Sequence, residues 1–525
     1  MSITKMEETG QIARTASLVS GATLLSRLAG LVRDQVAGYY FGTSQVMDIF
    51  TVAFRIPNLL RRLLAEGALT AAFVPVFSET LTDGGPAAAA ALFRNMFTLL
   101  AMVLTLLSLL GAAFAPQIVT LTASGWADPG KYQMAVFLTR VLFPYIFFMG
   151  LGALFMGALN AKGFFVAPAL GPVMSNLAMI AGAVILGPRL DPPILGLALG
   201  ALVGGGLQLA IQLPGLRQAG LPLRPSFKFL SPGVKKILML MGPAALGAAV
   251  YQLSVFINTN LASYLPESSL SYLYYADRLM QFPLGIFSVA IGTAALPALA
   301  RQSAQGDQEG FLGSARFALG LSFFITAPAM AGLIGLARPL VATLFQRGQF
   351  DAQSALGTAA ALQAYALGLP FLSGAGLLAR IFYSRADTRT PALVGAYSLA
   401  LGVAAALLLM GPLEYFGLAL ASSISSLINF FWLYGKLLLR EKNFPRAALR
   451  REVAVYFLLA ALMGLAVWPL GLWAGAAIGR PLALTLKTLA AVAGGVMIYV
   501  GLALVTRQAH ALTLLRLWRR PKGRI

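Results

Sequence analysis

Apolar segments long enough to cross a lipid bilayer follow one another along almost the whole chain. A membrane-spanning helix needs about 20 predominantly apolar residues, and the sequence contains fourteen runs of about this length. With 58% hydrophobic and only 11% charged residues, the chain cannot be an ordinary soluble domain. We therefore predict an all-α polytopic membrane protein with helices at approximately 16–40, 46–78, 93–116, 133–158, 166–187, 192–213, 237–264, 270–300, 313–337, 355–378, 391–411, 415–436, 452–475 and 482–506.

The distribution of lysine and arginine predicts how these spans are oriented. The formal net charge is +21, which in a soluble protein would suggest a nucleic-acid partner. Here the basic residues lie mainly in the loops after 192–213, 355–378 and 415–436 and in the C-terminal tail, whereas the alternate loops carry few. The positive-inside rule then places both termini in the cytoplasm, with the basic amphipathic tail on the anionic lipids of the inner leaflet and no role for nucleic acid. The first run lacks the features of a cleavable signal and is expected to remain as a span.

The sequence lacks the motifs of several common enzyme classes. The chain has no cysteine, and its single histidine, His510, lies beside the basic tail. No phosphate-binding glycine loop and no metalloprotease or serine-hydrolase motif occurs. We therefore expect a transporter rather than an enzyme, with no cofactor and no structural or catalytic metal. A coupling cation or the membrane potential would supply its energy.

Short motifs recur at an offset of about 223 residues. The motif TAAFVP at Thr70–Pro75 returns as TAALP at Thr293–Pro297, and GLAL at 196–199 returns at 417–420. Four further pairs occur in the same order, which predicts an internal duplication of six spans. We divide the chain into an N-terminal repeat (1–220), a C-terminal repeat (221–445) and two extra spans with the tail (446–525). An even number of spans gives both repeats the same orientation, so they are expected to enclose a central cavity that works by alternating access.

Charged side chains lie inside the predicted spans, where each costs roughly 2.5–3.5 kcal/mol at the bilayer centre. They are Arg27, Arg33 and Asp34 in the first span, Asp48, Arg55, Arg61, Arg62 and Glu66 in the second, and Asp277 and Arg278 in the eighth. One interpretation is a ladder of ion pairs, which the i,i+4 spacing of Arg62 and Glu66 favours. The other is a polar cavity that binds an anion, because arginine holds two phosphate oxygens at once and stays charged.

Helical geometry does not place every charge of the second span. Asp48, Arg55 and Arg62 share one face with Glu66 at 100° per residue, whereas Arg61 points elsewhere on an ideal helix. Pro57 is expected to kink this helix and to rotate the residues after it. In the sixth span, Gly200 and Gly204 form a pair of small residues that predicts close helix packing rather than a binding site.

Three segments carry a resemblance to a known family. They are SRLAGLVRD at Ser26–Asp34, the run MDIFTVAFRIPNLLRRLLAEGALTAAFVPVF at Met47–Phe77 and YYADRLMQFPLGIFSVAIGTAALP at Tyr274–Pro297. They closely resemble the MurJ (MviN) family of lipid II flippases, within the multidrug/oligosaccharidyl-lipid/polysaccharide exporter superfamily. The resemblance extends over about 16–506 and implies a protein that moves lipid-linked peptidoglycan precursor across the cytoplasmic membrane. The two last spans would then shape a groove for its polyprenyl tail.

The resemblance also implies roles for particular residues. The family's substrate-binding positions fall on Arg27, Arg33, Arg61, Arg278, Asp48 and Asn58, which favours Arg61 over Arg62 as a cavity residue. Supporting positions are Ser26, Asp34, Arg55, Arg62, Glu66, Asp277 and Gln281. Gln281 departs from the family, which often has glutamate there. The implied partners are lipid II, the surrounding membrane lipids and proteins of cell-wall synthesis.

Other functions compete with this interpretation. The nearest is a flippase for another polyprenyl-linked glycan, and a more distant one is an exporter of cationic drugs, which would need an acidic cavity. A membrane glycosyltransferase would need a carboxylate at the outer surface, and the candidates there are Asp128, Asp191, Glu267, Asp351 and Glu414. A scaffold of cell-wall synthesis would have no need of buried arginines.

Overall fold

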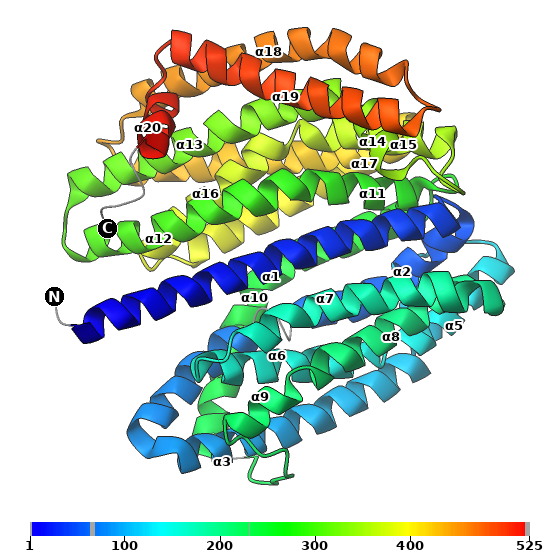
Figure 1. Cartoon of the computed structure of the whole chain (residues 1–525), viewed down its shortest axis with the longest axis vertical. Helices are drawn as coiled ribbons and strands as arrows, with labels where there is room; N and C mark the ends of the chain where they lie inside the picture. The colour runs from blue at the N-terminus through cyan, green and yellow to red at the C-terminus, as the bar shows by residue number, and fades with distance from the viewer. Residues whose placement is uncertain (1–2, 64–68, 230, 520–525) are drawn as a thin grey trace. The chain divides into compact units, whose positions relative to one another are not determined.

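The computed structural model describes residues 3–63, 69–229 and 231–519, except for the side chains of 3–20, 243–251, 514 and 517–519. Every regular element within these ranges is a helix, which confirms the all-α prediction (Figure 1). The chain forms two compact units, Met1–Ser268 and Ser269–Ile525.

Unit 1 is a bundle built around buried phenylalanines. Its core joins Phe73, Phe77 and Phe93 of α3 to Phe155 of α6 and Val234 of α10, all almost fully buried. The helices of unit 1 are α1 (Ile3–Phe41), α2 (Gln45–Leu60), α3 (Thr70–Ala113), α4 (Ala115–Thr122), α5 (Pro129–Leu142), α6 (Tyr145–Ala161), α7 (Val166–Ala181), α8 (Ile194–Ala210), α9 (Leu213–Gln218) and α10 (Pro232–Ala262). A π-helical turn, Gly182–Leu186, extends α7.

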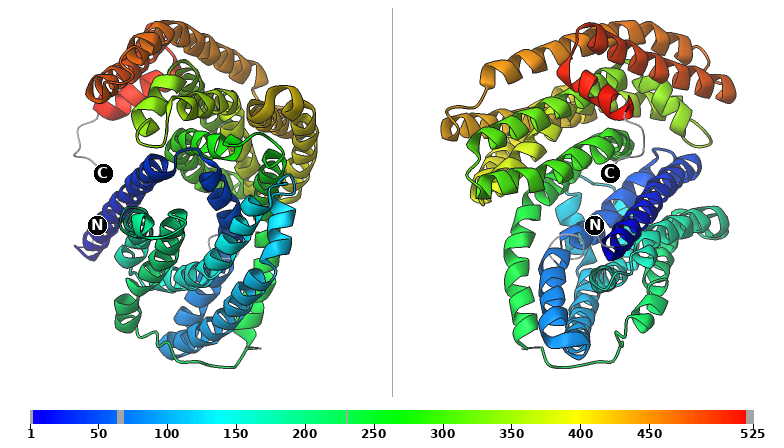
Figure 2. Two further views of the ribbon diagram at one scale, coloured as in Figure 1. Left: turned by 90° about the vertical axis from the view of Figure 1, so that its right-hand side faces the viewer. Right: turned by 60° about the vertical axis from the view of Figure 1, so that its left-hand side comes forward.

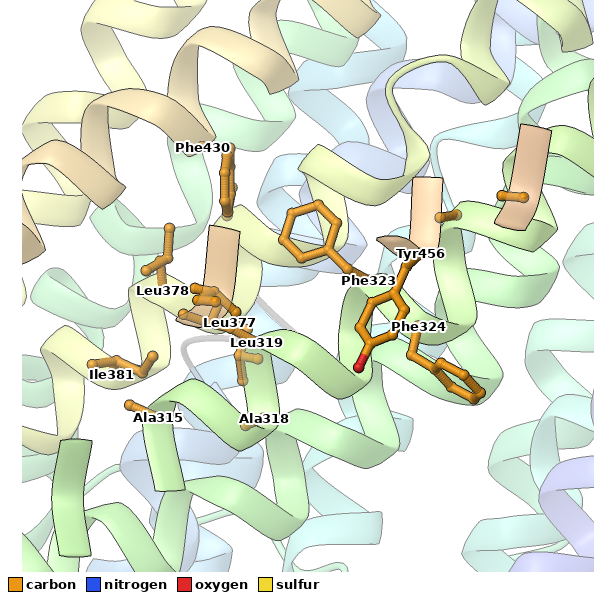
Figure 3. Close-up of a cluster of buried hydrophobic side chains, with 14 of the residues drawn as sticks. Ala315, Ala318, Leu319, Phe323, Phe324, Leu377, Leu378, Ile381, Phe430 and Tyr456 are labelled. Carbon is orange, nitrogen blue, oxygen red and sulfur yellow. The ribbon is translucent and has the colours of Figure 1, made fainter. Parts of the chain in front are cut away.

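Unit 2 has its own core, in which α13 packs against α16, α17 and α18. Figure 3 shows Phe323 and Phe324 of α13 with Phe430 of α17 and Tyr456 of α18 in this core. Figure 2 shows α18 and α19 running alongside each other. The helices of unit 2 are α11 (Ser269–Pro283), α12 (Val289–Ala304), α13 (Gln308–Gly335), α14 (Ala337–Phe345), α15 (Ala352–Ala366), α16 (Leu369–Ser384), α17 (Arg389–Arg440), α18 (Arg446–Gly475), α19 (Pro481–Val505) and α20 (Ala509–Arg519).

Helix ends recur at the offset that the sequence motifs show. Asp128 caps the N-terminus of α5 by accepting a hydrogen bond from the Gly130 amide at 2.9 Å. At the same place in the second repeat, 223 residues later, Asp351 caps α15 by accepting from the Ser354 amide at 2.8 Å. This hydrogen bond lowers the pKa of the Asp351 carboxyl group. Equivalent caps on equivalent helices support the duplication.

A second local feature also recurs. Residues 61–63 continue α2 as a π-helical turn, and a π-helical turn at Leu284–Ser288 comes after α11 at the equivalent position. By contrast, the compact units divide after Ser268 because α10, which the motifs assign to the second repeat, packs against α3. The division at 1–220, 221–445 and 446–525 stays a prediction.

The described part of the structure contains fewer candidate membrane helices than the fourteen spans that the sequence predicts. Within the described ranges, nine helices are long and apolar enough to cross a membrane, and α15 with α16, bent by 45°, makes a tenth candidate. Part of the difference arises because α17 holds two of the predicted runs and changes direction at Glu414, where φ is 48°. The chain is therefore a multi-pass helical protein, and the total of fourteen spans stays a prediction.

Glycines bring α8 into backbone contact with α7. A Cβ atom at Gly200 would lie 2.7 Å from the Ala178 carbonyl oxygen and 2.8 Å from the Met179 Cα atom. At Gly204 it would lie 2.8 Å from the Ser175 carbonyl oxygen. These distances leave no room for a side chain, which confirms the predicted packing role of the glycine pair.

Within unit 2, helix α20 packs on α13 and α18 through His510, the only histidine of the sequence. His510 is 2% exposed, and its Nε2–H donates to the Phe317 carbonyl oxygen of α13 at 3.1 Å. Its Nδ1 atom lies 2.6 Å from the Tyr456 hydroxyl of α18, and the imidazole stacks on the Phe317 ring. Gly320 makes room for the ring, because a Cβ atom there would lie 2.7 Å from the His510 Cε1 atom.

This docking predicts a stability change with pH. Burial lowers the pKa of His510, and Arg316 adds to this effect, although the Phe317 carbonyl and the Glu452 carboxylate oppose it. A lowered pKa in the docked state means that stability is intact above the ordinary pKa of about 6.5 and falls as the pH drops below it. We expect the melting temperature to decline between about pH 6.5 and 5 in the wild type. The melting temperature of His510→Phe should be lower than that of the wild type at pH 7.5, because the variant loses two hydrogen bonds of about 1 kcal/mol each. It should not change between about pH 6.5 and 5, because phenylalanine does not titrate. If the melting temperature of the wild type also stayed constant between about pH 6.5 and 5, the prediction would be contradicted.

Candidate functional site

Arg33 lies in a polar network between α1 and α7. Its Nε and Nη2 atoms donate to Asp34 Oδ1 at 3.1 and 2.7 Å, and its Nη1 donates to Asn176 Oδ1 at 3.0 Å. Asn176 in turn donates from Nδ2 to the Ser26 carbonyl oxygen at 3.3 Å. Asp34 and Asn176 are buried, whereas Arg33, Ser26 and the neighbouring Arg27 are half-buried. The structure thus brings together three of the predicted positions and adds Asn176.

Two of the predicted residues of α2 contact each other at its C-terminal end. Arg61 Nε donates to the Asn58 side-chain oxygen at 3.0 Å, one turn earlier in the helix. The π-helical turn at 61–63 begins with Arg61, four residues after Pro57. A π-turn contains more residues than an α-turn and so changes the direction of the side chains within it. The ideal-helix wheel therefore does not apply to Arg61.

The remaining charges of α2 have different surroundings. Arg55 and Arg62 are half-buried. Glu66 lies outside the described residues, and with it the predicted Arg62–Glu66 ion pair. Asp48 is 2% exposed, and its Oδ2 accepts a hydrogen bond from the Ser268 amide at 2.9 Å. Asp48 therefore ties the start of α2 to the segment after α10.

Unit 2 contains the other predicted site residues on α11. The Arg278 guanidinium lies over the Tyr274 ring, 4.9 Å from its centroid. One turn further along, the Gln281 amide donates a hydrogen bond to the Asp277 carboxylate. A glutamate at 281 would set two carboxylates against each other at this contact, so glutamine suits this neighbour better.

The sequence patterns did not identify Asn176 and Tyr274 as site residues. The available signal for Asn176 was an amide inside an apolar helix, which usually marks a hydrogen-bonded position. Two further basic residues, Arg140 and Lys487, lie inside predicted spans, and the sequence alone does not orient them. Arg140 is exposed on α5, and the Lys487 ammonium lies 4.7 Å from the centroid of the Trp473 ring. Within the described part of the chain, no three acidic, histidine or cysteine side chains gather as metal ligands would.

Solved structures with a similar fold define the class of this protein. A chain described as "Lipid II flippase MurJ, inward closed conformation" matches with a TM-score of 0.78 and 26% identity, covering 94% of this chain and 99% of that one. An inward-facing MATE-family multidrug transporter of the MOP superfamily matches with a TM-score of 0.68 at 16% identity, which is a likeness of fold alone. The fold, with its apolar membrane-length helices, defines a multi-pass helical membrane protein whose architecture is shared by these transporters.

Sequence comparisons give the family. The sequence profile of the family "Lipid II flippase MurJ" matches residues 37–475. The lipid II flippase MurJ of Burkholderia cenocepacia is 40% identical over 426 residues, covering 80% of this chain and 83% of that protein. The probable lipid II flippase MurJ of Haemophilus influenzae is 37% identical over 464 residues, covering 85% and 90%. The chain belongs to the lipid II flippase MurJ family. This confirms the family resemblance that the sequence motifs carry.

Proposed function

We propose that this protein moves lipid II from the inner to the outer leaflet of the bacterial cytoplasmic membrane by alternating access. The observation that carries the proposal is the match of residues 37–475 to the lipid II flippase MurJ family. In addition, α1 and α2 contain arginines within predominantly apolar segments. Lipid II carries a pyrophosphate between its sugar headgroup and its polyprenyl tail. A membrane passage for this molecule therefore needs cationic groups that bind phosphate without losing their charge.

The arginines suit this task by their chemistry. We assign pyrophosphate binding to Arg27, Arg33, Arg61 and Arg278, with Asn58 and Asp48 as further substrate-binding positions. A guanidinium offers several N–H donors in one plane, so it can hold one phosphate bidentately and another group at the same time. Arg33 already uses three of its nitrogen atoms on Asp34 and Asn176, which fixes its orientation before the substrate arrives.

The proposal extends to location and energy. Both termini would lie in the cytoplasm, as the distribution of basic loops predicts. An inside-negative potential favours outward movement of an anion by about 2.3 kcal/mol per charge per 100 mV, so the potential or a coupling cation would drive the cycle. Membrane lipids surround the protein in this proposal, and proteins of cell-wall synthesis are its functional partners.

The helix caps weigh against the glycosyltransferase alternative. Two of its five candidate carboxylates, Asp128 and Asp351, are occupied in capping α5 and α15. Hydrogen bonds from backbone amides hold these groups as structural acceptors. A flippase for a different polyprenyl-linked glycan shares the arginine chemistry and is separated from the proposal by experiment.

Depletion of the host's lipid II flippase tests the proposal directly. The gene for this chain replaces the depleted flippase, and the exposure of lipid II on the outer face is measured with a probe that cannot cross the membrane. We expect exposure to return to the level given by the host protein. If the chain is well expressed in the membrane and exposure does not return, lipid II is not its substrate. Recovery of another polyprenyl-linked glycan would then favour the alternative.

A further inference from the structure

We infer that Asn176 is a positioning residue for the substrate-binding arginine Arg33. The inference rests on the proposed function, because it assigns Asn176 a part in binding the lipid-linked pyrophosphate. Asn176 lies on α7, 143 residues from Arg33, and is 8% exposed. It lies outside the three segments that carry the family resemblance, and it is far from the arginines in the sequence.

The amide of Asn176 makes two different contacts with α1. Its oxygen accepts from Arg33 Nη1 at 3.0 Å, and its nitrogen donates to the Ser26 carbonyl oxygen at 3.3 Å. Ser26 and Arg33 are seven residues apart and so lie on the same face of α1. One side chain therefore holds both the guanidinium and the backbone segment that precedes Arg27.

The chemistry of the contact explains why an amide stands here rather than a second carboxylate. Asp34 already supplies one negative charge to Arg33, at 2.7 Å from Nη2. A second carboxylate would neutralise the guanidinium further and would oppose the incoming phosphate. The neutral amide orients Arg33 through a hydrogen bond and leaves the net charge of the pair unchanged. It is also both donor and acceptor, as the two contacts require.

A positioning residue acts through its partner, which a double-mutant cycle detects. We would measure lipid II affinity of the full-length purified protein in lipid nanodiscs for the wild type, Asn176→Ala, Arg33→Ala and the double variant. Without this hydrogen bond the guanidinium must be ordered when the substrate binds, which is expected to lower affinity by up to about tenfold. We expect this loss for Asn176→Ala in the wild-type background and no further loss in the Arg33→Ala background.

Asn95→Ala is the matched control. Asn95 lies on α3 and is 5% exposed. Its side chain accepts from the Ser226 hydroxyl at 2.5 Å and donates to the Ser231 hydroxyl at 3.3 Å, so it is a buried asparagine that joins two segments through serines. We expect its alanine variant to lower thermal stability but to keep lipid II affinity. If Asn95→Ala and Asn176→Ala lowered affinity alike, the loss would reflect general destabilisation and the positioning role would fall.

The outcomes separate this inference from the proposed function. An equal loss for Asn176→Ala in both backgrounds, or no loss in the wild-type background, overturns the positioning role while lipid II binding stands. If the wild type does not bind lipid II, the proposed function falls. The same four proteins are then titrated with inorganic pyrophosphate. If the wild type does not bind pyrophosphate, or if the effects of Asn176→Ala and Arg33→Ala on its affinity are independent, the inference is overturned as well.

Discussion

Arg61→Ala should abolish lipid II translocation while the protein still accumulates in the membrane. Arg61 is half-buried at the end of α2, and its Nε is held by Asn58 at 3.0 Å. A bidentate contact with phosphate supplies two hydrogen bonds to a charged group, each about 1.5–3 kcal/mol. Because 1.4 kcal/mol is about tenfold in binding, losing both lowers affinity on the order of a hundredfold or more. Outer-face exposure of lipid II in the flippase-depleted strain is the measurement.

Two further variants show whether charge or geometry matters at this position. Arg61→Lys keeps the positive charge but loses the planar fork, so we expect partial activity between the wild type and Arg61→Ala. Arg189→Ala is the control, because Arg189 is exposed and donates to the Ile185 carbonyl oxygen four residues earlier; it should flip lipid II normally. If the Arg61→Ala variant gave normal outer-face exposure of lipid II, the assignment of Arg61 to pyrophosphate binding would be wrong.

Local patterns in the sequence predicted the all-α class and one close contact between helices. The length of an apolar run and the spacing of small residues are properties of neighbouring residues. The all-α class and the contact role of Gly200 and Gly204 could therefore be predicted from the sequence. The duplication is predicted from the order of motifs, and the helix caps Asp128 and Asp351 lie at the same offset of 223 residues.

The partners of the charged residues could not be predicted in the same way. Arg33 meets Asn176 across 143 residues, and Asp48 meets Ser268 across 220. Such contacts depend on how whole helices pack, which no local pattern contains. Arg61 shows a second limit, because a helical wheel assumes regular geometry and this residue opens a π-helical turn. At this position the family resemblance, and not the wheel, supplied the hypothesis that Arg61→Ala tests.

Gly200→Ala should destabilise the protein although alanine is the better helix former. The added methyl group would lie 2.7 Å from the Ala178 carbonyl oxygen and 2.8 Å from the Met179 Cα atom. Backbone atoms cannot rotate away as a side chain can, so α7 and α8 must separate. Overpacking of this kind costs about 1–3 kcal/mol, and Gly200→Leu should cost more and reduce the amount of folded protein in the membrane. Thermal unfolding of the purified variants in detergent measures both effects.

Gly206 provides the comparison within the same helix. A Cβ atom there would lie 3.9 Å from the Phe148 Cε1 atom, which is an ordinary contact. Gly206→Ala should therefore be neutral or stabilising, since glycine costs about 1 kcal/mol relative to alanine inside a helix. The two substitutions are chemically identical and six residues apart, so a difference in melting temperature isolates the contact with α7. Equal melting temperatures for the two alanine variants would mean that α7 and α8 yield at Gly200, and that the close packing of these helices contributes little to the stability of unit 1.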